Sequence, residues 1–461
     1  MNGYNEFIAT KQIAYKETGL KHEVEINPFL FPFQRDIVRW ALRKGKAAIF
    51  ADCGLGKTLM QLEWARHIHE HTGRSILIVA PLAVTEQTKL EGQKISVLVN
   101  VCKYQDDVTP GINITNYERL DNFNADWGGI ILDESSILKN YSGKTRTDLI
   151  RKFHDVPFKL ACTATPSPND FMELGNHSEF LNEMRYSEML PMFFVHDGGE
   201  TAKWRLKGHA EDSFWAWVAS WAAVMTKPSD LDYDDDGFIL PPLNISDIII
   251  RADKPADGFL FPIKAQTLNE RRNARRSTID DRVLQCAELV NNTKDPFLIW
   301  CDLNSESSML TKAIPGAVEI KGADSIKYKE ENIIGFSHGD YRVLVTKPSI
   351  AGFGVNWQHC HNMAFVGLSD SFEAYYQAVR RCWRFGQKNR VNVYIITSEL
   401  EGNVIENIKR KERNAHEMIM QMVEHTKRIV KSHVRKESNG RGKYNPTNHI
   451  ILPEWIHESS N

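Results

Sequence analysis

The chain has 461 residues, a length that suggests two or three domains. Its 25% charged and 42% hydrophobic residues are typical of a soluble globular protein, and the net charge of −2 excludes a chain that is basic overall, so a surface for nucleic acid must be local. The seven cysteines include no C-x-x-C pair, which disfavours a disulfide framework or a zinc module. We find no apolar run of transmembrane length and no signal-peptide pattern, and we therefore expect a cytoplasmic protein without a membrane partner.

The first thirty residues carry only weak periodicity and end at Asn27-Pro28, so we expect an N-terminal extension there. Residues 31–36 read Phe-Pro-Phe-Gln-Arg-Asp, and apolar residues at helical spacing follow them. The side-chain amide of Gln34 both donates and accepts hydrogen bonds, so it could read an adenine ring. A solvated glutamine at the start of a helix is the alternative.

Residues 51–58 read Ala-Asp-Cys-Gly-Leu-Gly-Lys-Thr and lie between a short apolar run and a helical pattern. This order is typical of a phosphate-binding loop, because Gly54 and Gly56 let the backbone approach an anion and the helix start offers free N–H groups. Lys57 would reach the β- and γ-phosphates, and the Thr58 hydroxyl would ligate Mg²⁺. The complete motif begins with glycine and this chain has alanine, so a glycine turn that caps an ordinary helix is the alternative.

Short apolar runs of the buried parallel-strand type recur after this loop, with helix-like segments between them. They lie at residues 75–81, 112–115, 129–132 and 160–165. This alternation predicts a parallel sheet with helices on both faces. The third run ends in Asp133 and Glu134, at the sheet edge where open α/β folds place their ligands. Asp133 could hold Mg²⁺ and Glu134 could polarise the water that attacks a γ-phosphate, although adjacent acids also occur in solvated turns.

Residues 186–285 interrupt the alternation. They are rich in tryptophan and carry five aspartates between positions 230 and 236, so we expect a mostly helical insert or linker with a solvated acidic loop. Basic residues between positions 264 and 282 fit either the charged face of a helix or a contact with a phosphate backbone.

A second alternating unit begins near residue 296. Its strands are expected at residues 296–300, 318–320, 341–346, 363–368 and 391–397. In this unit residues 377–387 place Arg381 and Arg384 three positions apart, so on a helix both guanidinium groups would share one face and could meet a γ-phosphate held by the other unit. The alternative, an exposed basic helix, is the weaker interpretation because Trp383 and Phe385 lie beside them. The last thirty residues are polar and basic and predict a partly disordered tail.

Taken in order, these motifs resemble those of a superfamily 2 helicase or translocase, and they are most similar to the motifs of SNF2-like ATPases. The resemblance spans roughly residues 31–400. The matching segments, from the adenine-reading Q-type motif to motif VI, are residues 34, 51–58, 80–82, 114–118, 133–136, 163–166, 352–356 and 377–387.

The chain departs from the pattern of the family at several positions. Motif II reads Asp-Glu-Ser-Ser, where SNF2-like proteins usually have Asp-Glu-Gly-His or Asp-Glu-Ala-His, and in motif VI Arg380 replaces a usual glycine and Trp383 a usual histidine. The insert is also short for a chromatin remodeller, which weakens any expectation of a role on chromatin. The compact form resembles bacterial and phage SNF2-like proteins, so we expect the cytoplasm of a bacterial or phage-infected cell.

The resemblance implies an α/β fold with two tandem RecA-like parallel-sheet domains and a mostly helical insert between them. The expected divisions are an N-terminal extension (1–30), an ATP-binding domain (31–185), the insert (186–285), a second domain with arginine fingers (286–430) and a basic tail (431–461). ATP and Mg²⁺ are the implied cofactors. The implied catalytic residues are Lys57, Asp133, Glu134, Arg381 and Arg384. The implied nucleotide contacts are Gln34, Gly54, Gly56, Lys57, Thr58, Gly354 and Gln377, with Thr58 and Asp133 as magnesium ligands.

The expected function is that of a DNA-stimulated ATPase that translocates on duplex DNA. An RNA or single-strand helicase of superfamily 2 is one alternative, because the motifs do not distinguish DNA from RNA. A nucleotide-dependent DNA-binding scaffold without motor activity is another. We recognise no appended nuclease, methylase or zinc module, so such an activity would need a partner protein.

Overall fold

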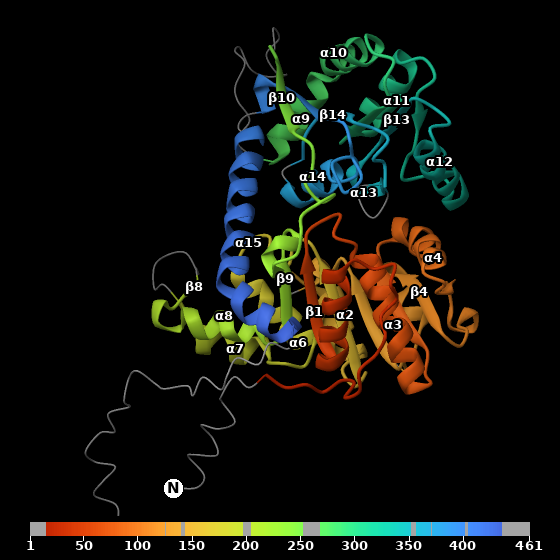
Figure 1. Ribbon diagram of the computed structural model, residues 1–461. Helices are drawn as coiled ribbons and strands as arrows, with labels where there is room; N and C mark the ends of the chain where they lie inside the picture. The colour runs from red at the N-terminus through yellow and green to blue at the C-terminus, as the bar shows by residue number, and fades with distance from the viewer. Residues whose placement is uncertain are drawn as a thin grey trace, which may run out of the picture.

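The structure is a computed structural model that describes residues 15–124, 126–139, 143–196, 204–251, 268–351, 356–369, 371–401 and 404–435. Two lobes lie one above the other in Figure 1, the lower built mainly from the N-terminal half of the chain and the upper from the C-terminal half. A parallel sheet lies at the centre of each lobe, which confirms the predicted fold of two tandem parallel-sheet domains. Within the described ranges, every helix is too short or too polar to span a bilayer.

The first lobe contains a seven-stranded sheet in the order β3-β4-β2-β5-β6-β1-β9, and all its neighbouring strands are parallel. The strands are β1 (Lys46–Ala51), β2 (Ile76–Ala80), β3 (Val99–Val101), β4 (Ile112–Asn116), β5 (Gly129–Asp133), β6 (Phe158–Thr163) and β9 (Ala222–Met225). Every residue of β2, β4, β5 and β6 is buried, as expected for strands that are covered on both faces.

Helices cover both faces of this sheet. They are α2 (Pro32–Lys44), α3 (Lys57–Thr72), α4 (Thr85–Lys94), α5 (Lys144–Lys152), α6 (Leu174–Phe180), α7 (Tyr186–Phe193) and α8 (Glu211–Ala219). Because successive side chains of a strand point to opposite faces, Ile49 packs in one core with α2 and α3, whereas Phe50 packs in the other with α6 and α8. A hydrophobic core therefore lies on each face of the sheet. The loops at the strand ends are not covered by these helices in the same way and can form a site.

The second lobe contains a six-stranded parallel sheet in the order β10-β15-β14-β11-β13-β12. Its strands are β10 (Leu243–Ile250), β11 (Phe297–Cys301), β12 (Val318–Glu319), β13 (Val343–Thr346), β14 (Asn362–Val366) and β15 (Val391–Ser398). Its helices are α9 (Leu268–Ser277), α10 (Ile279–Asn291), α11 (Asn304–Ala313), α12 (Ile326–His338), α13 (Pro348–Ala351) and α14 (Phe372–Val379).

The segment expected to be a helical insert, residues 186–285, is shared between the two lobes. It holds α7, α8 and α9, but also β9, β10 and the antiparallel pair β7 (Phe194–His196) and β8 (Trp204–Leu206). Strand β9 extends the first sheet beside β1, and β10 extends the second beside β15. The polypeptide between β9 and β10 therefore links the lobes directly, and the described part of this segment is not a separate unit.

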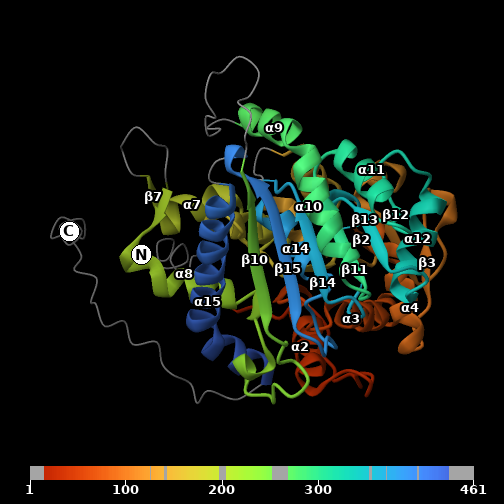
Figure 2. The same cartoon turned by 90° about the horizontal axis from the view of Figure 1, so that it is seen from above.

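The helix α15 (Val404–Arg435) runs along both lobes (Figure 1). Near its start, Val404 and Ile408 belong to a core of the second lobe, and Lys409 pairs with Asp247 of β10, in agreement with the view from above in Figure 2. Further along, Met422 and Val430 pack into the cores of the first lobe. The domain boundary expected at residue 430 therefore falls inside a continuous helix that contacts both lobes.

Candidate active site

The predicted phosphate loop connects β1 to α3, at the carboxyl edge of the first sheet. Gly54 and Gly56 have φ angles of 91° and 78°, which side chains of L residues rarely adopt. A Cβ atom on Gly56 would lie 2.2 Å from Gln34 Nε2, and one on Gly54 would lie 2.9 Å from the backbone nitrogen of Phe385 in the second lobe. Both glycines are therefore required by backbone conformation and by close neighbours.

Lys57 is the first residue of α3. Its Nζ donates to the backbone carbonyl groups of Ala51 at 2.8 Å and Asp52 at 3.3 Å, so the ammonium group lies against the loop. Thr58 follows it and is half-buried. The first N–H groups of a helix have no acceptor within the helix and mark the positive end of its dipole. Loop, ammonium group and helix start together suit a phosphate chain.

Gln34 is buried, and both ends of its amide have partners within the chain. Its Oε1 accepts from the backbone N–H of Phe31 at 2.9 Å, and its Nε2 donates to the carbonyl of Leu55 in the phosphate loop at 2.9 Å. Gln34 thus joins the start of α2 to the loop, a role that its sequence context does not show. Its contact with an adenine ring stays a prediction.

The acid pair lies at the end of β5. Gln61 Nε2 donates to Asp133 Oδ1 at 2.7 Å, and Thr163 Oγ1 donates to Glu134 Oε2 at 3.2 Å. Burial raises the pKa of both carboxyl groups, and the charge of Lys57 opposes this effect in both. The two carboxyl groups are therefore within electrostatic reach of the phosphate loop, as an acid pair that serves a bound phosphate requires.

Two further side chains, which were not among the predicted site residues, hold the same strand end. Tyr117 Oη donates to the backbone carbonyl of Asp133 at 2.7 Å. His177 Nε2, from α6, lies 3.1 Å from Ser135 Oγ, and both residues are fully buried. A buried imidazole therefore contacts motif II from a helix 42 residues further along the chain, a distance at which no sequence pattern signals the contact.

The buried imidazole gives a prediction for the pH dependence of stability. Burial lowers the pKa of His177 from its ordinary value of 6.5 to about 4, so below pH 6.5 the unfolded chain binds the proton while the folded chain does not. The free energy of unfolding should therefore fall by up to about 3 kcal/mol as the pH drops from 6.5 to 4. We expect His177→Phe to reduce this fall in urea denaturation, whereas replacing the exposed His154 should not; an unchanged pH dependence in His177→Phe would contradict the assignment.

Motif VI differs in shape from the prediction. Helix α14 ends at Val379, so Arg381 and Arg384 lie in the turns that follow and do not share a helical face. The amide of Gln387 holds these turns, because its Nε2 donates to the carbonyl groups of Gln358, Cys360 and Cys382. The expectation of a helix was wrong here, because the spacing of two arginines carries no information on these tertiary hydrogen bonds.

Arg381 is buried and directed by its neighbour Gln377. Its Nε donates to the Gln377 carbonyl and its NH2 group to Gln377 Oε1, both at 2.8 Å. Burial lowers the pKa of Arg381, and Cys53, Glu134 and Asp133 of the first lobe counteract this effect. The guanidinium of the second lobe is therefore coupled electrostatically to the acid pair of the first lobe.

Arg384 and Gly354 are the other two predicted site residues of the second lobe. Burial and the charge of Arg381 lower the pKa of Arg384 to about 10, so each guanidinium group makes the other more costly to keep charged. Gly354 lies outside the described residues, so its predicted contact with the nucleotide has no structural description.

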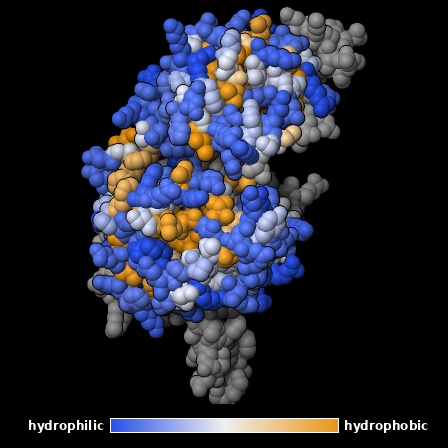
Figure 3. All heavy atoms as spheres, turned by 90° about the vertical axis from the view of Figure 1, so that its right-hand side faces the viewer, coloured by the Kyte–Doolittle hydropathy of each residue, from blue (hydrophilic) through white to orange (hydrophobic). Residues whose placement is uncertain are grey.

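The two lobes touch each other at this cleft. Besides the approach of Gly54 to Phe385, Lys139 pairs with Glu373 at the start of α14. On the face shown in Figure 3, a cavity of about 350 Å³ lies between α4 of the first lobe and α12 of the second. The site is thus assembled from both lobes, and each contributes groups that the other lacks.

Two family models match the regions of the chain that form this site. The family model described as the SNF2-related domain matches residues 33–194, and the one described as the helicase conserved C-terminal domain matches residues 281–386. A solved structure described as the Sulfolobus solfataricus SWI2/SNF2 ATPase core in complex with dsDNA is 17% identical, with a TM-score of 0.41, and the match covers 88% of this chain and 99% of that chain. A search of the curated proteins gives no match. The two matched regions contain the phosphate loop, the acid pair and motif VI, and the chain belongs to the SNF2-like ATPases of superfamily 2.

Proposed function

We propose that this protein is a DNA-dependent ATPase that moves along duplex DNA. The proposal is carried by one observation: the phosphate loop of the first lobe lies against the motif VI segment of the second, where Arg380 pairs with Asp52 and a Cβ atom on Gly54 would lie 2.9 Å from the backbone nitrogen of Phe385. Hydrolysis would then require both lobes in contact, and each cycle of contact and release would shift one lobe relative to the other.

The residues at the cleft fit a magnesium-bound nucleoside triphosphate. The glycine loop, Lys57 and the start of α3 would hold the phosphates. The hydroxyl of Thr58 and the carboxylate of Asp133 are the hard oxygen ligands that Mg²⁺ prefers. When bound, the ion would supply positive charge that offsets the negative charge of the phosphates.

The remaining chemistry is divided between the lobes. Glu134 would accept a proton from the attacking water, and burial makes it a stronger base than an exposed carboxylate. Arg381 would neutralise the charge that develops on the γ-phosphate, held in place by Gln377. Because Arg381 belongs to the second lobe, the rate of hydrolysis would depend on the position of that lobe relative to the first.

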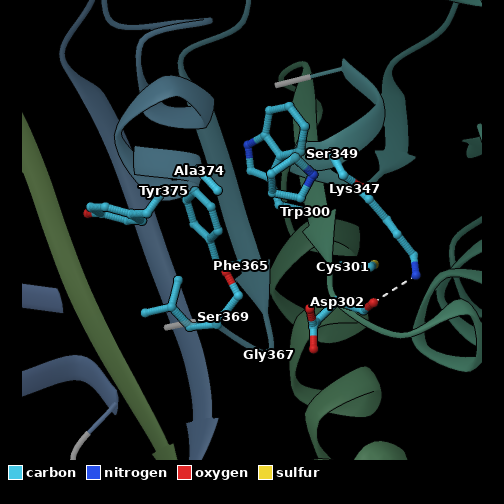
Figure 4. Close-up of a pocket in the computed structure, with 12 residues that line it drawn as sticks. Trp300, Cys301, Asp302, Lys347, Ser349, Phe365, Gly367, Ser369, Ala374 and Tyr375 are labelled. Carbon is cyan, nitrogen blue, oxygen red and sulfur yellow. Dashed lines mark hydrogen bonds between the residues drawn. The ribbon is translucent and has the colours of Figure 1, made fainter. Parts of the chain in front are cut away.

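For the nucleic acid we propose a contact at the carboxyl ends of β11, β13 and β14 (Figure 4). A cavity of about 180 Å³ lies there, and Asp302, Lys347, Ser349 and Ser369 are among the residues that line it. Lys347 Nζ donates to the backbone carbonyl of Asp302 at 2.7 Å, which holds the ammonium group at the cavity. An ammonium group and two hydroxyl groups suit a backbone phosphate.

The larger cavity between α4 and α12 is less suited to phosphate. Glu86, Glu91 and Glu330 line it, and Lys94, which pairs with Glu91 at 2.7 Å, offsets only one of these carboxylates, so its charge would repel the backbone of a nucleic acid. We therefore assign the phosphate contact in the second lobe to Lys347, and we expect binding to weaken steeply with salt.

The proposal is tested by measuring ATP turnover with duplex DNA, single-stranded DNA, RNA and no nucleic acid, at two salt concentrations. We expect duplex DNA to stimulate turnover most, and triplex displacement to follow on the same duplex. Stimulation by RNA or single strands alone would instead indicate a helicase, which an unwinding assay would confirm. ATP binding without stimulated turnover would indicate a scaffold.

A further inference from the structure

A third arginine of the second lobe, Arg380, reaches the phosphate loop. Its NH2 group forms an ion pair with Asp52 Oδ2 of that loop. Tyr376 Oη donates to Asp52 Oδ1 at 2.5 Å, and the backbone N–H of Cys53 donates to the same oxygen at 2.6 Å. One carboxylate of the phosphate loop is therefore held by two side chains of the opposite lobe.

The guanidinium group of Arg380 has a fixed place. The residue is only 4% exposed, and its guanidinium carbon lies 5.3 Å from the ring centre of Tyr376 and 4.8 Å from that of Trp383. Its Nε donates to Tyr376 Oη at 3.2 Å, and Trp383 is itself anchored through Nε1 to the carbonyl of Pro241 at 2.7 Å. Burial of a charged group is costly unless it is paired, and here Asp52 is the partner.

The two positions at which motif VI departs from the family pattern, Arg380 and Trp383, thus form one unit. Trp383 supplies one of the two rings against which Arg380 lies, and Arg380 makes the ion pair. The departures are explained together by this contact across the cleft.

Asp52 is also connected to the lysine of the loop. Its backbone carbonyl is one of the two acceptors of Lys57 Nζ, while its side chain is held by Arg380 and Tyr376. A change in the position of the second lobe would therefore be transmitted through Asp52 to the ammonium group that faces the phosphates.

We propose that Arg380 is a positioning residue for the phosphate loop, and that through Asp52 it sets Lys57 for hydrolysis when the lobes are in contact. This inference rests on the proposed ATPase function. It gives Arg380 a role different from that of Arg381: Arg381 touches the nucleotide, whereas Arg380 acts only through the loop. Contact between the lobes would then have two effects: it would bring Arg381 to the nucleotide, and it would place Lys57.

The first test is a double-mutant cycle of Arg380→Gln, Asp52→Asn and the double variant. Each single change leaves one charge at the contact between the lobes without its ion-pair partner, so we expect kcat to fall about tenfold or more, with a smaller change in KM for ATP. The double variant should lose no more than the worse single variant, because both changes remove the same contact. Tyr376→Phe removes one hydroxyl and should lower kcat less, and Arg390→Gln, an exposed arginine of the same segment, is the control.

A second readout does not depend on ATP turnover. Six of the seven cysteines are buried, and Cys53, next to Asp52, is only half-buried. Thiol labelling of the folded protein should therefore report on the loop, and we expect Arg380→Gln and Asp52→Asn each to raise the labelling rate of Cys53 severalfold while thermal denaturation still shows a folded chain.

The outcomes separate the inference from the function on which it rests. Multiplicative losses in the double variant, an unchanged labelling rate in Arg380→Gln, or faster labelling with normal kcat would each overturn the positioning role. A wild-type protein without ATP turnover under any condition would overturn both the proposed function and the positioning role in it, and the labelling rates would then show only whether the two lobes hold the loop.

Discussion

Lys57→Ala is expected to abolish ATP turnover, with a loss of at least about a hundredfold at saturating nucleic acid. The ammonium group lies against the backbone carbonyls of Ala51 and Asp52 and is the basic group of the phosphate loop itself. Without it, the negative charge of the β- and γ-phosphates would lose the cationic side chain of the loop and keep only backbone N–H donors there, so both binding and hydrolysis should suffer. Steady-state phosphate release measures the loss, and Lys312→Ala, which changes an exposed lysine of α11, is the matched control.

Glu134→Gln tests the acid pair of the same site, and so the hydrolysis step rather than the binding of phosphate. A glutamine can keep the hydrogen bond from Thr163 but cannot accept a proton from water, so turnover should vanish while ATP binding persists. The two variants together separate the binding of phosphate from its hydrolysis. Substantial turnover in both purified variants would refute the assignment of this cleft as an ATPase site.

Much of the fold could be predicted, because its signals are local. The apolar runs expected at residues 129–132 and 391–397 coincide with β5 (Gly129–Asp133) and β15 (Val391–Ser398). A strand buried on both faces must be apolar throughout, so it is visible in the sequence. The acid pair and the phosphate loop were found for the same reason, because each directly follows such a strand.

The edges of the sheets could not be predicted. Strand β9 has four residues, and β10 mixes Asn244, Ser246 and Asp247 with isoleucines because much of it faces solvent. Pairing at an edge is decided by distant partners, here β1 and β15, and not by the composition of the strand. An aspartate-rich stretch between them further suggested a solvated insert.

The contacts that fix the site are also long-range. His177 reaches Ser135 and Arg380 reaches Asp52 across 42 and 328 residues. A motif identifies a residue that contacts the ligand, because that chemistry restricts its type. The residue that holds it in place can come from any element that packs nearby, so only the folded chain reveals it.

Arg381→Ala should slow hydrolysis by about a thousandfold while ATP affinity changes by only a few-fold. The guanidinium group is held by Gln377 on the second lobe and is coupled electrostatically to Glu134 of the first, so we expect it to meet the γ-phosphate where charge develops during hydrolysis. An interaction made only in the transition state affects kcat and leaves ground-state binding nearly unchanged.

The comparison with Gln377→Ala sharpens this prediction. That change leaves the arginine in place but removes the acceptor that directs its NH2 group, so it should lower kcat in the same direction and by less. Phosphate release gives kcat, and titration with a fluorescent ATP analogue gives the affinity, with the exposed Arg390→Ala as control. A large loss of affinity with normal turnover would make Arg381 a binding residue. If turnover instead falls without loss of affinity, the loop of the first lobe binds the nucleotide and the second lobe controls when it is hydrolysed.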